Sequence, residues 1–210
     1  MSVFKNIALL LTFLVSFAFA KAQTSPQKTR ILFVFDASQS MYGRWDEGQK
    51  IQVATKLLRE IVDSLKSTEN VEVALRVYGH QNSVSSDGRN CKDTKLEVPF
   101  SAKNHDKIIE RLGSIRPKGT TLIAYSLEQA ANDFPKDKNA RNVIILITDG
   151  IEECDGDPCA VSLALQKRGV VLKPFVIGMG LEPEVIDAFK CVGNYYDATS
   201  AETFRDVLNI

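Results

Sequence analysis

Six side chains with hard oxygen atoms are the strongest candidates for chemistry in this chain: Asp36, Ser38, Ser40, Thr120, Thr121 and Asp149. Carboxylate and hydroxyl oxygens are ligands of hard divalent cations, and Mg²⁺ takes octahedral oxygen shells that keep some water. When few carboxylates bind directly, the ion stays electrophilic, so a carboxylate from another molecule can complete its shell. The pattern therefore predicts a Mg²⁺ site suited to docking a partner, with Mn²⁺ or Ca²⁺ as alternatives.

Two apolar runs position the acids of this set. Ile31 to Phe35 and Asn142 to Ile147 are continuous and rich in β-branched residues, which is typical of parallel strands buried on both faces. In open α/β sheets, ligands bind outside the carboxyl ends of the strands, and Asp36 and Asp149 follow those ends. The alternative is that these polar residues only tie down loops and cap a helix.

Strands and helices alternate along most of the remaining chain. We expect helices at 50–67, 105–112, 122–132, 158–168 and 182–191, further strands at 71–78, 96–100, 170–177 and 195–196, and loops at 43–49 and 81–95. The strand at 96–100 is short and contains Pro99, which favours an antiparallel edge position. The order predicts an α/β fold: a doubly wound, mostly parallel sheet with one antiparallel edge strand and helices on both faces, Rossmann-like.

The first 22 residues have the pattern of a signal peptide. Lys5 begins it, Ile7 to Ala20 form its apolar core, and small residues at Ala18, Ala20 and Ala22 suit cleavage. The apolar core is shorter than a membrane span of roughly 20 residues, so we expect no stable span after cleavage. We therefore divide the chain into a signal peptide at 1–22, a flexible lead-in at 23–29 and one domain at 30–210, in a periplasmic or secreted protein.

Charge content gives no indication of nucleic-acid binding, and cysteine content agrees with export. Without the leader the chain keeps 24 basic and 26 acidic residues, a net charge of −2, and no basic stripe indicates nucleic-acid binding. Four cysteines in an exported chain favour two disulfides: Cys91, Cys154, Cys159 and Cys191. Three pairings are possible, one of them a local Cys154–Cys159 ring, and the sequence does not choose among them. A zinc site is disfavoured by the spacings, and the two histidines, His80 and His105, have no ligand pattern; a turn or surface role is favoured for His80.

Three segments carry a family resemblance: Asp36-x-Ser38-x-Ser40, the threonine of Gly119-Thr-Thr121-Leu-Ile-Ala, and Thr148-Asp149-Gly150. In order and separation they match the metal-ion-dependent adhesion site of the von Willebrand factor type A domain, which the chain resembles from about Arg30 to its end. Arg76-Val-Tyr-Gly-His80 and the stretch from Ile147 to Cys159 are similar to the exported bacterial branch of that family.

The resemblance implies roles for the candidate residues. Ser38, Ser40 and Thr121 would ligate the metal directly or through water, whereas Asp36 and Asp149 would act mostly through water and hydrogen bonds. Thr121 is preferred over Thr120 because the family's helix usually begins one residue later, at Leu122. Members of the family bind protein partners, often through a partner Asp or Glu, and are seldom enzymes. We expect the same here, and the sequence assigns no oligomeric state.

Enzymatic functions agree less well with the sequence than a metal-dependent binding function does. A haloacid-dehalogenase-like phosphate-ester hydrolase would also place a nucleophilic acid after a first apolar strand, as at Asp36. That chemistry wants a second acid two residues on, where this chain has Ser38. No serine stands in a G-x-S-x-G turn, and Gly178-Met-Gly180 lacks the spacing of a dinucleotide-binding loop.

Overall fold

In this computed structural model, the described residues are 27–45, 48–84, 88–167, 175–178 and 183–197. Their main sheet has the strand order β5-β4-β1-β6-β7-β8. The strands are β1 (Thr29–Asp36), β4 (Val71–Tyr78), β5 (Thr94–Ser101), β6 (Arg141–Thr148), β7 (Phe175–Gly178) and β8 (Asn194–Asp197). All neighbours are parallel except β4 and β5, so the predicted antiparallel edge strand and the doubly wound, mostly parallel sheet are confirmed.

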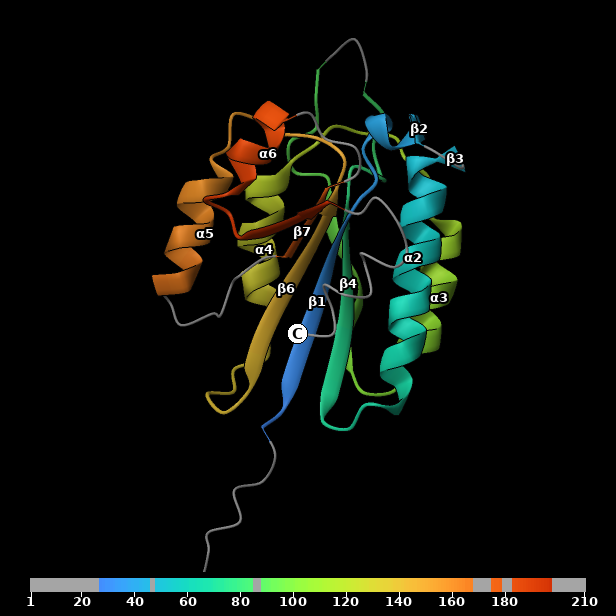
Figure 1. Ribbon diagram of the computed structural model, residues 1–210, viewed down its shortest axis with the longest axis vertical. Coiled ribbons are helices and arrows are strands. Elements are labelled where there is room, and N and C mark those ends of the chain that lie inside the picture. Colours follow the sequence, from blue (N-terminus) through green and yellow to red (C-terminus); the bar gives the residue numbers. More distant parts are fainter. Residues whose placement is uncertain (1–26, 46–47, 85–87, 168–174, 179–182, 198–210) are drawn as a thin grey trace, which may run out of the picture.

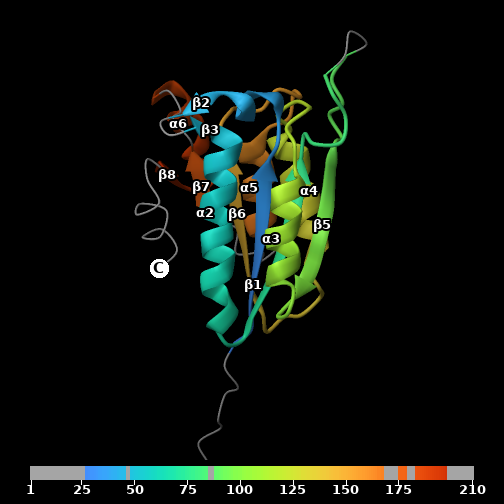
Figure 2. The same cartoon turned by 90° about the vertical axis from the view of Figure 1, so that its right-hand side faces the viewer.

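Helices cover both faces of this sheet (Figure 1, Figure 2). One face carries α2 (Lys50–Ser64), which continues into the 3₁₀ turn η3 (Leu65–Ser67), and α3 (His105–Ser114). The other carries α4 (Ile123–Asp133), α5 (Pro158–Lys167) and α6 (Pro183–Phe189). None of the helices in the described ranges is both long and apolar enough to cross a membrane.

Strand β1 is buried on both faces, as its unbroken apolar run predicts. Phe33 and Phe35 belong to the core beneath α2 and α3, and Leu32 and Val34 belong to the core beneath α4 and α5. All four are fully buried. Because successive strand residues point to opposite faces, one strand serves both cores, and its end is fixed from both sides.

One local expectation is wrong and another holds in part. The segment 43–49, expected to be a plain loop, contains a small antiparallel pair, β2 (Arg44–Trp45) and β3 (Gly48–Gln49), after the 3₁₀ turn η2 (Gln39–Tyr42). His80 lies in a bend after β4, as a turn role predicts, but it is buried and its Nε2 lies 2.9 Å from Oε1 of Glu97. The signal peptide, the start of the strand expected at 170–177 and the chain end after Asp197 lie outside the described residues.

Two disulfides join the cysteines. Cys91 pairs with Cys154, and Cys159 pairs with Cys191. This is one of the three pairings that the sequence left open, and it is not the local Cys154–Cys159 ring. The first disulfide ties the long loop after β4 to the loop after β6, both at the carboxyl ends of their strands.

Candidate metal centre

Asp36 lies fully buried at the end of β1, where both carboxylate oxygens are held. The backbone N–H of Ser38 donates to Oδ1 at 2.7 Å, and the hydroxyl of Thr148 donates to Oδ2 at 2.7 Å. Tyr78 in turn donates to the Thr148 hydroxyl at 3.1 Å. Burial, with the nearby charge of Asp149, raises the pKa of Asp36 to about 6 despite these donors. The carboxylate is therefore fixed in direction but carries a charge that is costly without a cation.

Ser38, Ser40 and Asp149 form a continuous chain of oxygens beside it. The two serine hydroxyls lie 2.9 Å apart, and the Ser40 hydroxyl donates to Oδ1 of Asp149 at 2.7 Å. Asp149 follows β6, so the contact joins the ends of two neighbouring parallel strands. The acids and serines that the sequence singled out are thus brought together, although Ser40 and Asp149 are 109 residues apart in the chain.

The two threonines of the third segment point to different partners. Thr120 donates its hydroxyl to Oε2 of Glu153, and the Thr121 backbone N–H donates to the same oxygen at 2.9 Å. A Cβ built on Gly150 would lie 3.6 Å from the Thr121 hydroxyl oxygen and 4.0 Å from that of Ser40. The Thr121 hydroxyl therefore lies on the side of the serines, which supports Thr121 over Thr120 as the candidate ligand.

Backbone contacts hold the threonine loop against the serine loop. Ser38 and Gly119 form an isolated parallel bridge, and the Gln39 N–H donates to the Gly119 carbonyl at 2.8 Å. Gly79, with a φ of 68°, lies between the loops. A Cβ there would come within 2.9 Å of both Ser38 N and the Thr120 carbonyl oxygen. Glycine is thus required for this close approach and for the left-handed backbone.

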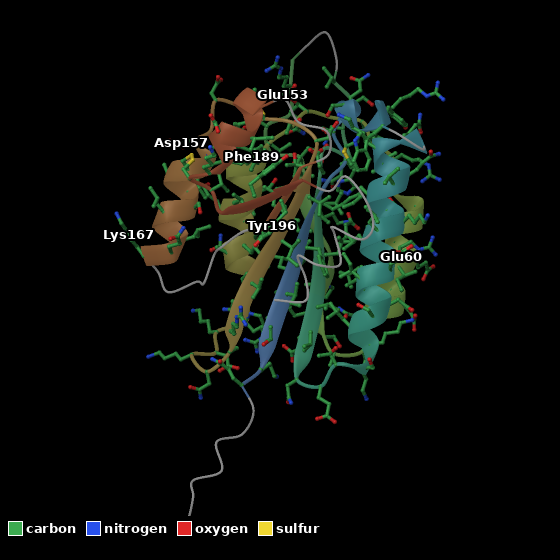
Figure 3. The ribbon with its side chains drawn as sticks, in the orientation of Figure 1. Glu60, Glu153, Asp157, Lys167, Phe189 and Tyr196 are labelled. Atoms are coloured by element: carbon green, nitrogen blue, oxygen red, sulfur yellow. A yellow bond between two sulfur atoms is a disulfide. The ribbon has the colours of Figure 1, made fainter. Side chains whose placement is uncertain are left out.

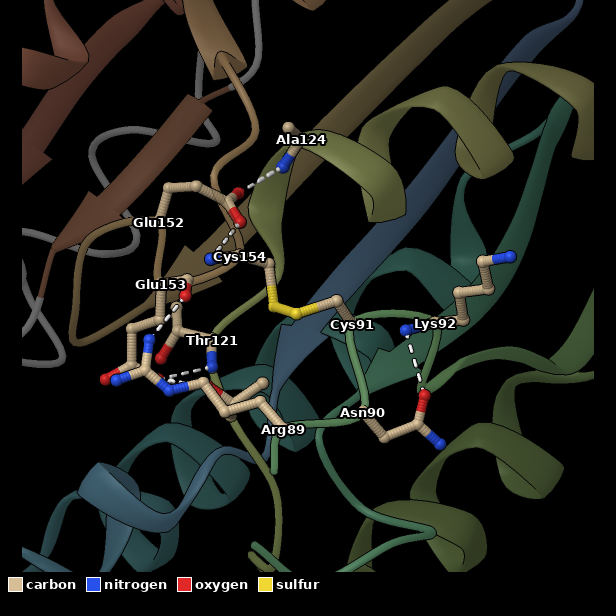
Figure 4. Close-up of a disulfide and its surroundings, with 10 residues drawn as sticks. Arg89, Asn90, Cys91, Lys92, Thr121, Ala124, Glu152, Glu153 and Cys154 are labelled. Atoms are coloured by element: carbon tan, nitrogen blue, oxygen red, sulfur yellow. Dashed lines mark hydrogen bonds between the residues drawn. A yellow bond between two sulfur atoms is a disulfide. The ribbon is translucent and has the colours of Figure 1, made fainter. Parts of the chain in front are cut away.

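Glu152 and Glu153 brace the threonine loop from the segment after β6 (Figure 4). Glu152 accepts from the Ala124 N–H at the start of α4 and from the Cys154 N–H, at 2.7 and 2.9 Å. Burial raises the pKa of Glu153, but the donors at Thr120 and Thr121 outweigh it and hold that pKa below its usual value. Figure 3 shows Glu153 at the carboxyl end of the parallel strands. The Cys91–Cys154 disulfide lies at the same end, as Figure 4 shows.

Lys50, the first residue of α2, completes the electrostatics of the site. Its Nζ lies 2.9 Å from Oδ2 of Asp149, whose side chain is fully buried. Thr148, Glu152 and Glu153 lie in stretches that carry the family resemblance, but their types and spacing alone indicate no role at the site, and neither do those of Lys50. The two glutamates stand close behind Asp149 in the sequence, which is a weak signal, whereas nothing in the sequence indicates that Lys50 points back to Asp149.

The donor set fits a hard divalent cation. It consists of oxygen atoms only: hydroxyls of Ser38, Ser40 and Thr121, with the carboxylates of Asp36 and Asp149 beside them. In the described part of the chain, no three His, Cys, Asp or Glu side chains gather as a metal site. A cation at this rim of the sheet, the carboxyl ends of β1 and β6, would therefore rely on hydroxyl ligands, which suits Mg²⁺ or Mn²⁺ better than a soft metal. That these residues are ligands stays a prediction.

Comparison with known proteins shows the fold described above and the family that the sequence motifs resemble. The family model of the von Willebrand factor type A domain matches residues 31–209. The uncharacterized protein YwmC of Bacillus subtilis is 31% identical over 167 residues, covering 78% of this chain and 72% of that protein.

Several solved structures share the fold, among them the following two. BatB, a conserved hypothetical protein from Bacteroides thetaiotaomicron, has a TM-score of 0.65 at 17% identity, covering 87% of this chain and all of that one. Proximal thread matrix protein 1 from the mussel byssus, solved with a zinc-occupied MIDAS motif, has a TM-score of 0.65 at 22% identity. The match covers 87% of this chain and 45% of the mussel chain.

Proposed function

Because the chain belongs to the von Willebrand factor type A domain family, we propose that it is an exported protein-binding module that captures a partner through a divalent metal ion. The ion is Mg²⁺, with Mn²⁺ or Ca²⁺ as possible substitutes, and the partner is a protein that presents an Asp or Glu carboxylate. The observation that carries the proposal is the convergence of three hydroxyls with only two carboxylates at one rim of the sheet.

Each residue has a part in this function. Bound metal supplies an electrophilic centre with a coordination position open to an external carboxylate. Ser38, Ser40 and Thr121 hold the ion with neutral oxygens, so the atoms that bind it directly cancel none of its charge. Asp36 and Asp149 balance part of that charge and orient the hydroxyls, because Ser40 donates to Asp149 and the Ser38 backbone is fixed by Asp36. The mussel protein's zinc-occupied motif is a precedent for a divalent ion in this fold.

We propose binding without catalysis. For a phosphate-ester hydrolase, Asp36 would have to attack substrate, but its side chain is fully buried and both of its oxygens accept hydrogen bonds. The position two residues on, which would need to be the general acid, is Ser38. The geometry therefore suits an Asp36 that orients and balances charge, not one that acts as a nucleophile.

Export is supported by the two disulfides, which form and persist in oxidising compartments. A periplasmic or secreted location agrees with a partner outside the cytoplasm. The adhesion or assembly role follows from the carboxylate-binding chemistry, since a metal-mediated contact can link two proteins without a large apolar interface.

Thermal unfolding of the mature, oxidised protein tests the proposal. The midpoint should rise when millimolar Mg²⁺ or Mn²⁺ replaces chelator, because a ligand that binds only the folded state stabilises it. Asp36→Ala and Ser38→Ala should abolish the rise, and the control Ser67→Ala, at the exposed end of η3, should keep it. A rise that persists in both site variants would refute the proposed site.

A further inference from the structure

Lys50 is held against the metal site by two separate contacts, one from its backbone and one from its side chain. Its backbone N–H donates to the Gly43 carbonyl at 2.9 Å. Its ammonium reaches Asp149 at 2.9 Å, and the Lys50 side chain is only 19% exposed. A long, flexible side chain is thus ordered and largely buried, which costs conformational entropy and calls for a compensating role.

The place of this charge in helix α2 is unfavourable by itself. The N-terminus of a helix carries a partial positive charge, so a lysine at the first helical position is repelled. The first turn of α2 contains no acidic residue that would offset this. The attraction that keeps Lys50 in place comes from outside the helix, from the carboxylate of Asp149.

The charges at the site explain what Lys50 does there. Asp36 and Asp149 carry two negative charges when ionised, and Lys50 reduces the total to one. A divalent cation added to this set leaves one positive charge in excess, whereas without Lys50 the same ion would be neutralised. An external carboxylate supplies the missing negative charge.

We propose that Lys50 makes metal capture depend on the partner's carboxylate. The ammonium stabilises the metal-free site by shielding the two acids from each other, and it weakens binding of the ion alone. Ion and carboxylate then bind cooperatively, and each strengthens the other by the same factor. This inference rests on the proposed function and adds that the site releases its ion when no partner is present.

Titration calorimetry with Mn²⁺ tests the inference, with sodium acetate as the carboxylate probe and sodium chloride at equal ionic strength as the reference. Wild-type protein should bind Mn²⁺ weakly in chloride and several-fold more tightly in acetate. Lys50→Met should bind Mn²⁺ in chloride roughly tenfold more tightly than wild type, the scale of one nearby charge after solvent screening, and should lose most of the acetate effect.

Two controls separate charge from packing. Lys56→Met removes an exposed lysine of the same helix and should behave like wild type, as should Lys50→Arg, which keeps the charge. Unfolding in chelator verifies that each variant is folded. Equal Mn²⁺ affinity and an equal acetate effect in wild type and Lys50→Met would overturn the inference and leave the metal site intact. Absence of Mn²⁺ binding in every variant, with and without acetate, would overturn the proposed function as well.

Discussion

Mild acidification should stabilise the metal-free protein through Asp36, the opposite of the usual effect on a paired carboxylate. Burial and the charge of Asp149 raise the pKa of Asp36 from 3.8 to about 6. Because the folded value lies above the unfolded one, its contribution to stability is complete below 3.8 and is lost as the pH rises through about 6. A shift of about two pKa units corresponds to roughly 3 kcal/mol, and somewhat less than half of that falls between about pH 5 and 7.5.

Urea unfolding in chelator, at those two pH values, measures this contribution in wild type and Asp36→Asn. The asparagine does not titrate, so the difference between the two proteins removes the effects of groups that do not interact with Asp36. One such group is His105, whose pKa is lowered by burial and whose protonation destabilises the fold as the pH falls. Between the two pH values, the stability difference between wild type and variant should change by about 1 kcal/mol in favour of wild type at the lower pH. Identical pH slopes in the two proteins would refute the reasoning.

Three further perturbations have expected outcomes. Glu153→Gln should weaken Mn²⁺ binding by roughly tenfold in calorimetry, as for other residues that orient metal ligands; unchanged affinity would exclude a positioning role. The buried guanidinium of Arg76 donates to both Asp133 oxygens at 2.7 and 2.8 Å. Asp133→Ala leaves this charge buried without its carboxylate and should destabilise the protein by about 3 kcal/mol in urea unfolding. A loss below ~1 kcal/mol would mean that water reaches the arginine. Replacing Cys91 and Cys154 by serine should cost up to about 4 kcal/mol for a disulfide that spans 63 residues, and an unchanged urea midpoint would show that the loop is held by other contacts.

The strands that carry the site were predictable because they are buried on both faces. Such strands appear in the sequence as unbroken apolar runs. Strand β1 ends at Asp36 itself, and β6 ends one residue before Asp149. The proximity of Asp36 and Asp149 then follows from a parallel sheet, in which the carboxyl ends of neighbouring strands lie at the same end of the sheet. The antiparallel edge position was predictable from Pro99, but the expected short strand at 96–100 is in fact β5 of eight residues, Thr94–Ser101.

The parts that the sequence did not reveal depend on contacts between distant residues. Lys50 and Asp149 are 99 residues apart, and only the folded structure shows that the start of α2 points at the end of β6. The disulfide pairing depends on which loops meet at the rim. The β2 and β3 strands have two residues each, too few for any periodicity to appear.

Anomalous diffraction from crystals of the protein grown with Mn²⁺ would locate the bound ion. We expect one strong peak at the carboxyl end of β1 and β6, within bonding distance of the hydroxyl oxygens of Ser38, Ser40 and Thr121. A strong peak elsewhere, or no peak at this rim when Mn²⁺ and acetate are both present at saturating concentration, would contradict the proposed metal site.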